Sequence, residues 1–188
     1  MTTPPTTILL ISGSLRSGST NAAVLQTAQA IAPAGVDAII YSGLASLPHF
    51  NPDLDADPLP PAAAAFRDQL SAVDAVLFST PEYAGALPGS LKNLLDWTVG
   101  DAASSGMPVG WINASARHGG ATGAHHELHV VVTYTDWSVI DAACVALPVT
   151  RSDIGADGLL NSPALRDAIA VSLAALVDAV SERRSPPG

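Results

Sequence analysis

Hydroxyl side chains and one arginine crowd a short glycine-containing stretch near the N-terminus. Residues 13–21 read GSLRSGSTN and follow the apolar run of residues 8–11. A Walker A loop would have lysine directly after Gly18, but this chain has Ser19, so the cation that holds a nucleoside triphosphate is missing. Leu15 occupies a position that must be glycine in a dinucleotide-binding loop. The pattern therefore argues against both a triphosphate and a dinucleotide.

A single terminal phosphate fits the remaining chemistry of this loop. Hydroxyl groups, backbone N–H groups and the N-terminal end of a helix all favour a phosphate monoester. Arg16, one of only eight basic residues in the chain, adds a charge-assisted hydrogen bond. The candidates for holding the phosphate are Ser14, Arg16, Ser19, Thr20 and Asn21. Taken alone, the stretch is equally well explained as an ordinary strand-to-helix turn that Ser19 or Thr20 caps.

Two further loops offer a different kind of surface. Residues 81–89 read PEYAGALPG, so few side chains crowd their backbone and a flat ligand can lie against it, with Tyr83 near a face or rim. Residues 114–123 offer the Ser115 hydroxyl and the backbone of two consecutive glycines to the other end of such a ligand. Alone, the stretch 81–89 also reads as a plain turn before a helix.

An alternation of buried strands and amphipathic helices must position these loops. Short apolar runs predict buried strands, and apolar residues at helical spacing predict helices between them. The predicted strands are residues 8–11, 36–41, 75–78 and 109–113, with a fifth within 138–147. This alternation predicts an α/β fold, a three-layer sandwich in which helices cover both faces of a doubly wound parallel sheet. Five strands favour the flavodoxin-like order 2-1-3-4-5.

In that order the first, third and fourth strands are neighbours, and a ligand crevice opens at their carboxyl ends. The loops at residues 13–21, 81–89 and 114–123 follow these three strands. All three loops therefore line one crevice, which is the strongest argument from the residues themselves for a binding site there.

The composition limits the partners and the compartment that we expect. The chain has 188 residues, a net charge of −9 and a pI of about 4.6, which disfavours nucleic acid and anionic membranes as partners. We expect one domain over residues 1–188, with flexible tails at 1–6 and 184–188. No secretory signal or membrane-spanning stretch is visible, which favours a cytoplasmic protein. The single cysteine, Cys144, excludes a disulfide and reads as a small buried hydrophobe.

Two motifs of a known family match this chain. The first, GS-[LI]-R-x-x-S-x-N, is matched by Gly13, Ser14, Leu15, Arg16, Ser19 and Asn21. The second, P-E-Y-N-x-x-x-P-G-x-L-K-N-x-x-D-W, is matched by Pro81, Glu82, Tyr83, Pro88, Gly89, Leu91, Lys92, Asn93, Asp96 and Trp97. The pair resembles the NAD(P)H-dependent FMN reductases of the flavodoxin-like superfamily, which include quinone, azo and chromate reductases.

The resemblance implies FMN as the cofactor and NAD(P)H as the co-substrate. The first loop would hold the FMN phosphate, and the other two loops would hold the isoalloxazine through Pro81, Glu82, Tyr83, Ala84, Gly85, Ser115, Gly119 and Gly120. Hydride would pass from NAD(P)H to FMN and on to a quinone, a free flavin or a similar small acceptor. We expect no catalytic side chain, because the flavin N5 atom carries the chemistry. The resemblance also implies a homodimer or homotetramer.

Two departures from the family pattern keep other functions open. Ala84 replaces the usual asparagine, which removes a side-chain hydrogen bond near the flavin. The third loop lacks the usual G-x-R-A-x-x-Q-L-R, which weakens the argument for the nicotinamide side and the subunit interface. The alternatives are a non-enzymatic FMN-binding electron carrier or flavin sensor, and a family member that has lost FMN.

The remaining candidate residues give no second site. His118, His125, His126 and His129 form a cluster in the sequence, but no cysteine joins them, so we expect surface histidines and no metal. The proline-rich stretch at residues 48–61 is expected to border the pocket that selects the electron acceptor. The identity of that acceptor and the preference for NADH or NADPH stay open.

Overall fold

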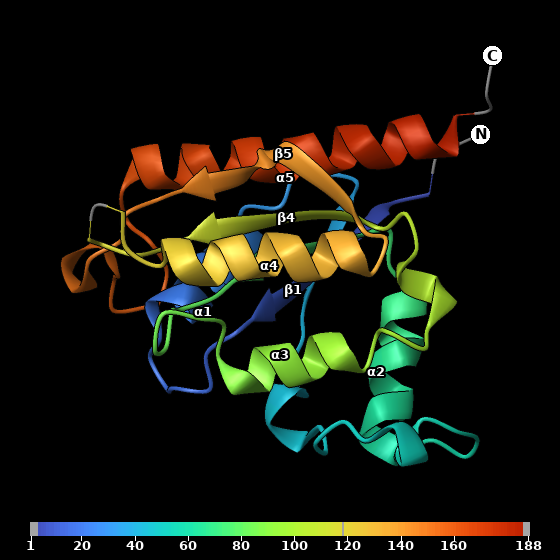
Figure 1. The fold of residues 1–188 in the computed structure, drawn as a ribbon. Coiled ribbons are helices and arrows are strands. Elements are labelled where there is room, and N and C mark those ends of the chain that lie inside the picture. The colour runs from blue at the N-terminus through green and yellow to red at the C-terminus, as the bar shows by residue number, and fades with distance from the viewer. Residues whose placement is uncertain (1–3, 118, 186–188) are drawn as a thin grey trace.

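A parallel sheet of five strands forms the centre of the computed structural model, which describes residues 4–117 and 119–185 (Figure 1). Its strands are β1 (Thr6–Ser12), β2 (Val36–Ile40), β3 (Ala75–Ser79), β4 (Pro108–Asn113) and β5 (Ser138–Ala146). They lie in the order β2-β1-β3-β4-β5, and every neighbouring pair is parallel. The predicted fold class and strand order are confirmed.

Helices cover both faces of this sheet, as the continuously apolar strands predict. They are α1 (Thr20–Ala30), α2 (Pro61–Ser71), α3 (Gly89–Asp96), α4 (Thr122–Tyr134) and α5 (Pro163–Arg184). Ile8 and Leu10 of β1 lie in the core beneath α1 and α5, whereas Leu9 and Ile11 lie in the core beneath α2, α3 and α4. Successive strand residues thus point to opposite faces and bury both of them.

The edge strand β5 pairs irregularly with β4. Their register shifts between Val109 and Trp111, and a side chain at the intervening Gly110 would collide with Ala143 of β5. Cys144, which follows this irregularity, is half-buried, so the expectation of a buried cysteine is only partly met. Even this partial burial raises the pKa of its thiol to about 11.

The ordered part of the chain extends further toward both ends than we expected. Thr6 belongs to β1 and pairs with Val36, so it does not lie in a tail. Arg184 belongs to α5 and forms a 2.7 Å ion pair with Asp74. Residues 1–3 and 186–188 of the expected tails lie outside the described residues. None of the helices in the described part of the chain has both the length and the apolar character that crossing a bilayer requires.

The proline-rich stretch at residues 48–61 is attached to α3. The carbonyl oxygen of Pro48 accepts hydrogen bonds from Asn93 Nδ2 and from Trp97 Nε1, each at 2.9 Å. Asn93 Oδ1 in turn accepts a 2.7 Å hydrogen bond from the backbone N–H of Phe50. The last residues of the second family motif therefore fix this stretch against α3.

Candidate functional site

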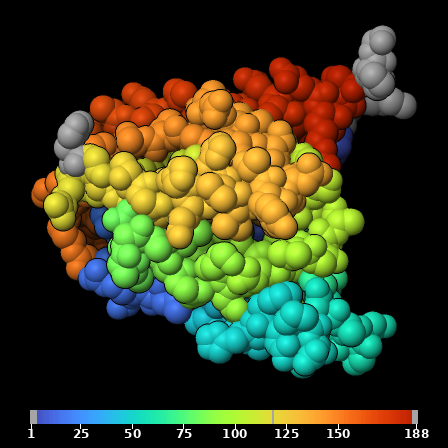
Figure 2. Space-filling view, in the orientation of Figure 1, coloured from blue at the N-terminus to red at the C-terminus, as the bar shows by residue number. Residues whose placement is uncertain are grey.

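A crevice opens where the loops after β1, β3, β4 and β5 come together. Two adjoining cavities of about 360 and 440 Å³ form it. They are lined in common by Thr20, Asn21, Pro81, Ala116 and Val149. Figure 2 shows the molecule hollowed between the blue N-terminal loop, the green loop after β3, the yellow start of α4 and the orange residues after β5. Cavities of this size accommodate cofactors and other small ligands.

The loop at residues 13–21 presents hydroxyl groups and a helix N-terminus to the larger cavity. Ser12 Oγ accepts a hydrogen bond from the Ser14 N–H, and Ser14 Oγ accepts one from the Arg16 N–H, so the loop folds on its own side chains. Ser19 stands at the N-cap position of α1, yet its side chain makes no capping hydrogen bond. It is only 7% exposed and lines the cavity. The simple explanation of this stretch as a side-chain-capped turn therefore fails at Ser19.

Asn21 lines both cavities, and a hydrogen bond to the end of β3 fixes its side chain. Ser79 Oγ at the end of β3 lies 2.9 Å from Asn21 Oδ1 and also 2.9 Å from the carbonyl oxygen of Ile112 in β4. A hydroxyl has one proton, so Ser79 can donate to only one of these two oxygens at a time. Asn21 ties α1 to the strand ends.

The loop at residues 81–89 makes a tight hairpin turn. Tyr83 and Ala86 exchange two backbone hydrogen bonds, of 3.0 and 3.1 Å. The two residues between them, Ala84 and Gly85, have φ values of 54° and 79°. Asparagine and glycine adopt positive φ easily, whereas alanine does so at a cost of about 1–2 kcal/mol. Ala84 thus departs from the family pattern in backbone preference, and its exposed side chain lies away from the cavity lining.

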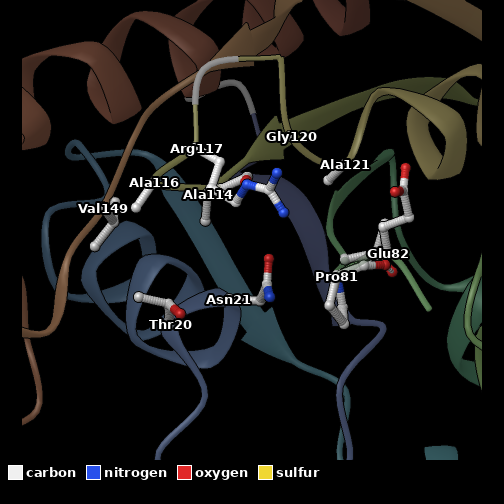
Figure 3. Close-up of a pocket in the computed structure, with 12 residues that line it drawn as sticks. Thr20, Asn21, Pro81, Glu82, Ala114, Ala116, Arg117, Gly120, Ala121 and Val149 are labelled. Atoms are coloured by element: carbon white, nitrogen blue, oxygen red, sulfur yellow. Dashed lines mark hydrogen bonds between the residues drawn. The ribbon is translucent and has the colours of Figure 1, made fainter. Parts of the chain in front are cut away.

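Two carboxylates attach this turn to α4. Glu82 Oε2 accepts a 3.1 Å hydrogen bond from the Ala124 N–H in the first turn of α4. Glu127 Oε2 accepts a 2.7 Å hydrogen bond from the Leu87 N–H. The positive end of the α4 helix dipole also stabilises the negative charge of the Glu82 carboxylate. Both acids therefore have structural partners, and in Figure 3 the Glu82 side chain points toward the start of α4.

Close backbone contact completes this attachment. A side chain at Gly123 would collide with the carbonyl oxygen of Gly85, and its Cβ would lie 2.8 Å from Glu82 Oε2. Only glycine allows the first turn of α4 to approach the hairpin turn so closely. The loop after β3 and the start of α4 are therefore in direct backbone contact.

The loop at residues 114–123 is built mainly from backbone contacts. The Gly120 N–H donates to the Arg117 carbonyl oxygen at 2.8 Å, and Asn113 Nδ2 donates to the Gly120 carbonyl oxygen at 2.9 Å. Ala121 has a φ of 59° at the start of α4. The Arg117 side chain reaches toward the middle of the cavity, above Asn21, as Figure 3 shows.

The histidines near this loop do not form a common site. His125 is buried, contrary to the expected surface position, while His126 and His129 are exposed. His118 lies outside the described residues. Among residues 4–117 and 119–185, no group of three or more His, Cys, Asp or Glu side chains is close enough to hold a metal ion.

His125 packs in the neutral form. Its Nδ1 atom lies 2.6 Å from the carbonyl oxygen of Ala121, so Nδ1 carries the proton, and Nε2 is buried without a partner among the described residues. Burial lowers the pKa of His125, although the hydrogen bond to Ala121 and the charge of Glu82 oppose that effect.

A fourth loop, which the sequence analysis did not single out, closes the crevice after β5. It contributes Val149, Thr150 and Arg151, and the Arg151 Nη1 atom donates a 2.9 Å hydrogen bond to the carbonyl oxygen of Gly18. The signal for this loop was available: it follows the strand next to β4 in the predicted order, and it carries one of the eight basic residues.

Most of the predicted site residues line the crevice. These are Ser14, Arg16, Ser19, Thr20, Asn21, Pro81, Glu82, Tyr83, Ser115 and Gly120. Ala84, Gly85 and Gly119 do not line it; they form the adjoining turns. Tyr83 lies in the larger cavity, together with Ser14 and Arg16. No residue of the stretch 48–61 lines either cavity, which contradicts the expectation that this stretch borders the site.

Unpaired positive charge gathers in this crevice. Arg16, Arg117 and Arg151 line it, and among the described residues none of them has a carboxylate within the 4.0 Å of an ion pair. The chain as a whole carries a net charge of −9. A local excess of cations beside free helix N–H groups and hydroxyls can bind an anionic ligand against that overall charge.

The family model and the similar proteins of known name point to the same family. A family model described as NADPH-dependent FMN reductase matches residues 6–151. An NAD(P)H-dependent FMN reductase of Pseudomonas aeruginosa is 36% identical over 90% of this chain and 92% of its own length. A quinone reductase of Pseudomonas putida is 32% identical over 91% of this chain and 90% of its own length.

A solved structure agrees. The flavoenzyme NAD(P)H:(acceptor) oxidoreductase FerB from Paracoccus denitrificans superposes with a TM-score of 0.83 at 27% identity, covering 94% of this chain and 98% of that one. The sheet order, the loop chemistry and these matches lead to one conclusion. The chain belongs to the NADPH-dependent FMN reductase family.

Proposed function

We propose that the protein is an FMN-dependent oxidoreductase that takes hydride from NAD(P)H and reduces a quinone, a free flavin or a similar small acceptor. Family membership supports the cofactor and the reductase activity, and the relatives named quinone reductase support the class of acceptor. The observation that carries the proposal is the crevice, where a cationic, hydroxyl-lined end adjoins an end lined largely by backbone and small side chains.

The end of the crevice beside α1 suits the phosphate of FMN. Ser14 and the uncapped, buried Ser19 present hydroxyl groups, and the first turn of α1 presents backbone N–H groups. Arg16 supplies a guanidinium without a carboxylate partner among the described residues. This set of donors suits a dianionic monoester and would be costly to leave facing an apolar ligand.

The end between β3 and β4 suits the ring of FMN. Pro81, Ala114 and Gly120 leave a surface with few projecting side chains, and Arg117 adds positive charge. When bound, FMN supplies a group that accepts a hydride and then gives up two electrons. The chain itself binds and orients the ring, and positive charge at this end favours the electron-rich reduced form. Glu82 is used to hold α4, so no proton-transfer role is assigned to it.

The rival functions also involve this crevice. A non-enzymatic electron carrier or a flavin sensor would bind FMN equally well but would not accept hydride rapidly from NAD(P)H. A member that had lost FMN would have no use for three arginines without ion-pair partners at one site. The names of the relatives, which are reductases, favour the enzymatic function.

Anaerobic mixing of the FMN-loaded protein with NADPH or NADH tests the proposal. The visible absorbance of the flavin should bleach with at least one of the two nucleotides and recover when a benzoquinone is added. The faster nucleotide identifies the preferred donor. An absorbance that stays constant with both nucleotides would support a carrier or sensor. Protein that remains colourless and takes up no FMN would support loss of the cofactor.

We also propose that the chain forms a homodimer or homotetramer, with a second copy covering the surface between α3 and α4. Val99, Val130 and Tyr134 are 60%, 52% and 87% exposed there, beside two shallow apolar cavities. An apolar surface of this kind on a soluble enzyme usually marks an interface. Light scattering should give a mass above that of one 19.1 kDa chain, and Tyr134→Glu should shift it toward the monomer.

Three other expectations stay predictions. We propose that residues 1–188 act as one FMN-binding domain, that the protein is cytoplasmic, and that it binds neither nucleic acid nor membranes. The net charge of −9 supports the last of these. Limited proteolysis, cell fractionation, and sedimentation with DNA or anionic vesicles would test them.

A further inference from the structure

Arg151 links two segments that are far apart in the sequence. It stands 133 residues after Gly18, yet its Nη1 atom donates a 2.9 Å hydrogen bond to the Gly18 carbonyl oxygen. It lines the same cavity as Ser14, Arg16 and Ser19. A guanidinium has five N–H donors, and Gly18 uses one of them. The cavity therefore receives a second arginine, from the loop after β5.

The surrounding turn holds Arg151 in place without neutralising it. Asp153 Oδ2 accepts hydrogen bonds from the backbone N–H and the hydroxyl of Thr150, at 2.8 and 2.6 Å. These bonds lower the pKa of Asp153 and direct its carboxylate toward Thr150. No ion pair forms between Arg151 and a carboxylate within residues 4–117 and 119–185. Its charge is therefore available to a ligand.

A second, independent observation points to a ligand at the same place. Ser19 is 93% buried, lines this cavity, and its hydroxyl makes no capping hydrogen bond to α1. The hydroxyl reaches the cavity, where a ligand or water can satisfy it. Ser19 and Arg151 thus offer donors to the same cavity from two different loops.

We propose that Arg151 is the second guanidinium of the phosphate subsite, and that FMN is held between Arg16 from the β1 loop and Arg151 from the β5 loop. This inference rests on the proposed function. A phosphate monoester carries nearly two negative charges at neutral pH, so two arginines balance it better than one. The arrangement makes the phosphate the bridge that joins the loop after β5 to the loop after β1.

A purely structural role is the main competitor. An arginine that only anchors Gly18 would position the loop after β1 for any flavin. Its loss would then weaken FMN and riboflavin equally, because riboflavin has the same ring and chain but no phosphate. The ratio of the two affinities separates the two roles, and it requires no turnover.

The experiment measures FMN and riboflavin dissociation constants by flavin fluorescence for the wild type, Arg151→Gln and Arg151→Lys. Arg151→Gln should weaken FMN by about 10- to 100-fold and leave riboflavin within about twofold. Arg151→Lys keeps the positive charge but loses the planar guanidinium with its several N–H donors. It should weaken FMN binding by a smaller factor than Arg151→Gln. The control is Arg183→Gln, which removes the same charge on α5, where the Arg183 side chain donates one weak hydrogen bond to the Ser105 carbonyl oxygen, far from the crevice lining.

Each outcome decides the matter. Equal losses for both flavins, or no loss with Arg151→Gln, would overturn the inference and leave Arg151 as a loop anchor or a bystander. A selective loss in both Arg151 variants, absent from Arg183→Gln, would support it. If the wild type binds neither flavin, the proposed function itself has failed. If Arg151→Gln does not fold, the FMN-to-riboflavin ratio of Arg151→Lys gives the same decision.

Discussion

The two ends of the crevice are built in different ways. Beside α1, side chains provide the binding groups. The larger cavity is lined there by hydroxyls and charged groups of Ser14, Arg16, Ser19 and Arg151. Between β3 and β4, backbone and small side chains form most of the lining, with Pro81, Ala114 and Gly120 among them, and the hairpin turn at residues 81–89 lies beside it. The first end can recognise charge, and the second can recognise shape.

This difference explains why the two ends tolerate different changes. At the α1 end, the Arg16 side chain lines the cavity and makes no ion pair among the described residues, so its removal changes which ligand binds and leaves the hydrogen bonds of the loop intact. At the other end Gly123 is packed so closely against Gly85 and Glu82 that a side chain there would displace Glu82, which lines the cavity. Comparing FMN with riboflavin, which lacks only the phosphate, distinguishes the two kinds of change.

Arg16→Ala should produce the largest shift between the two ligands. Removing a charge-assisted hydrogen bond should cost about 1.5–3 kcal/mol of FMN binding, which is about 10- to 100-fold, and should leave riboflavin nearly unchanged. Calorimetric titration with both flavins measures this. Equal losses would mean that Arg16 does not contact the phosphate and that the α1 end is not specific for charge.

Gly123→Ala should act on both ligands alike. The new methyl group would collide with the Gly85 carbonyl oxygen, and such overpacking typically costs about 1–3 kcal/mol. We expect a lower free energy of unfolding in urea and a similar loss of affinity for FMN and riboflavin. Gly89→Ala is the matched control, because a side chain there meets open space. A loss confined to FMN would contradict the shape-based description of this end.

His125 should make stability fall in mild acid. Because burial lowers its pKa in the folded state, the unfolded chain takes up a proton first as the pH drops below about 6.5. The free energy of unfolding should then fall by up to about 1.4 kcal/mol per pH unit and level off below the folded pKa. His125→Gln should reduce this slope, whereas His126→Gln, at an exposed position, should not. An unchanged slope in His125→Gln would contradict the assignment.

Ala84→Asn should have the smallest effect. Asparagine tolerates the φ of 54° better than alanine, so the variant should be more stable by about 0.5–1 kcal/mol with the FMN-to-riboflavin ratio unchanged. Ala84→Val should have the opposite sign, since a branched side chain is strained there. Thermal unfolding of both variants measures this, and a destabilised asparagine variant would show that the turn is not the reason for the family preference.

Much of the fold could be predicted because its signals are local. Apolar runs such as residues 8–11 and 75–78 give buried parallel strands, and their order brings three loops to one edge. The site residues in the first loop could be predicted for the same reason, since Ser14, Arg16 and Ser19 are close in sequence. Because their loop follows β1 directly, the predicted strand order is enough to place them at the crevice.

Other features depend on contacts that no local pattern encodes. Arg151 approaches Gly18 only because β5 is folded against β4, far along the chain. The positive φ of Ala84 is invisible because alanine has no preference for it. The stretch at residues 48–61 looked functional because it is long, but Asn93 and Trp97 hold it against α3 instead.

Titration of the unmodified protein with FMN and riboflavin at low and high salt is the most direct test of the central claim that one end of the crevice recognises a phosphate. Two guanidinium contacts predict that FMN binds at least about 100-fold more tightly than riboflavin. They also predict that only FMN binding weakens as salt screens the charges. Equal affinities for the two flavins, with equal dependence on salt, would contradict the account.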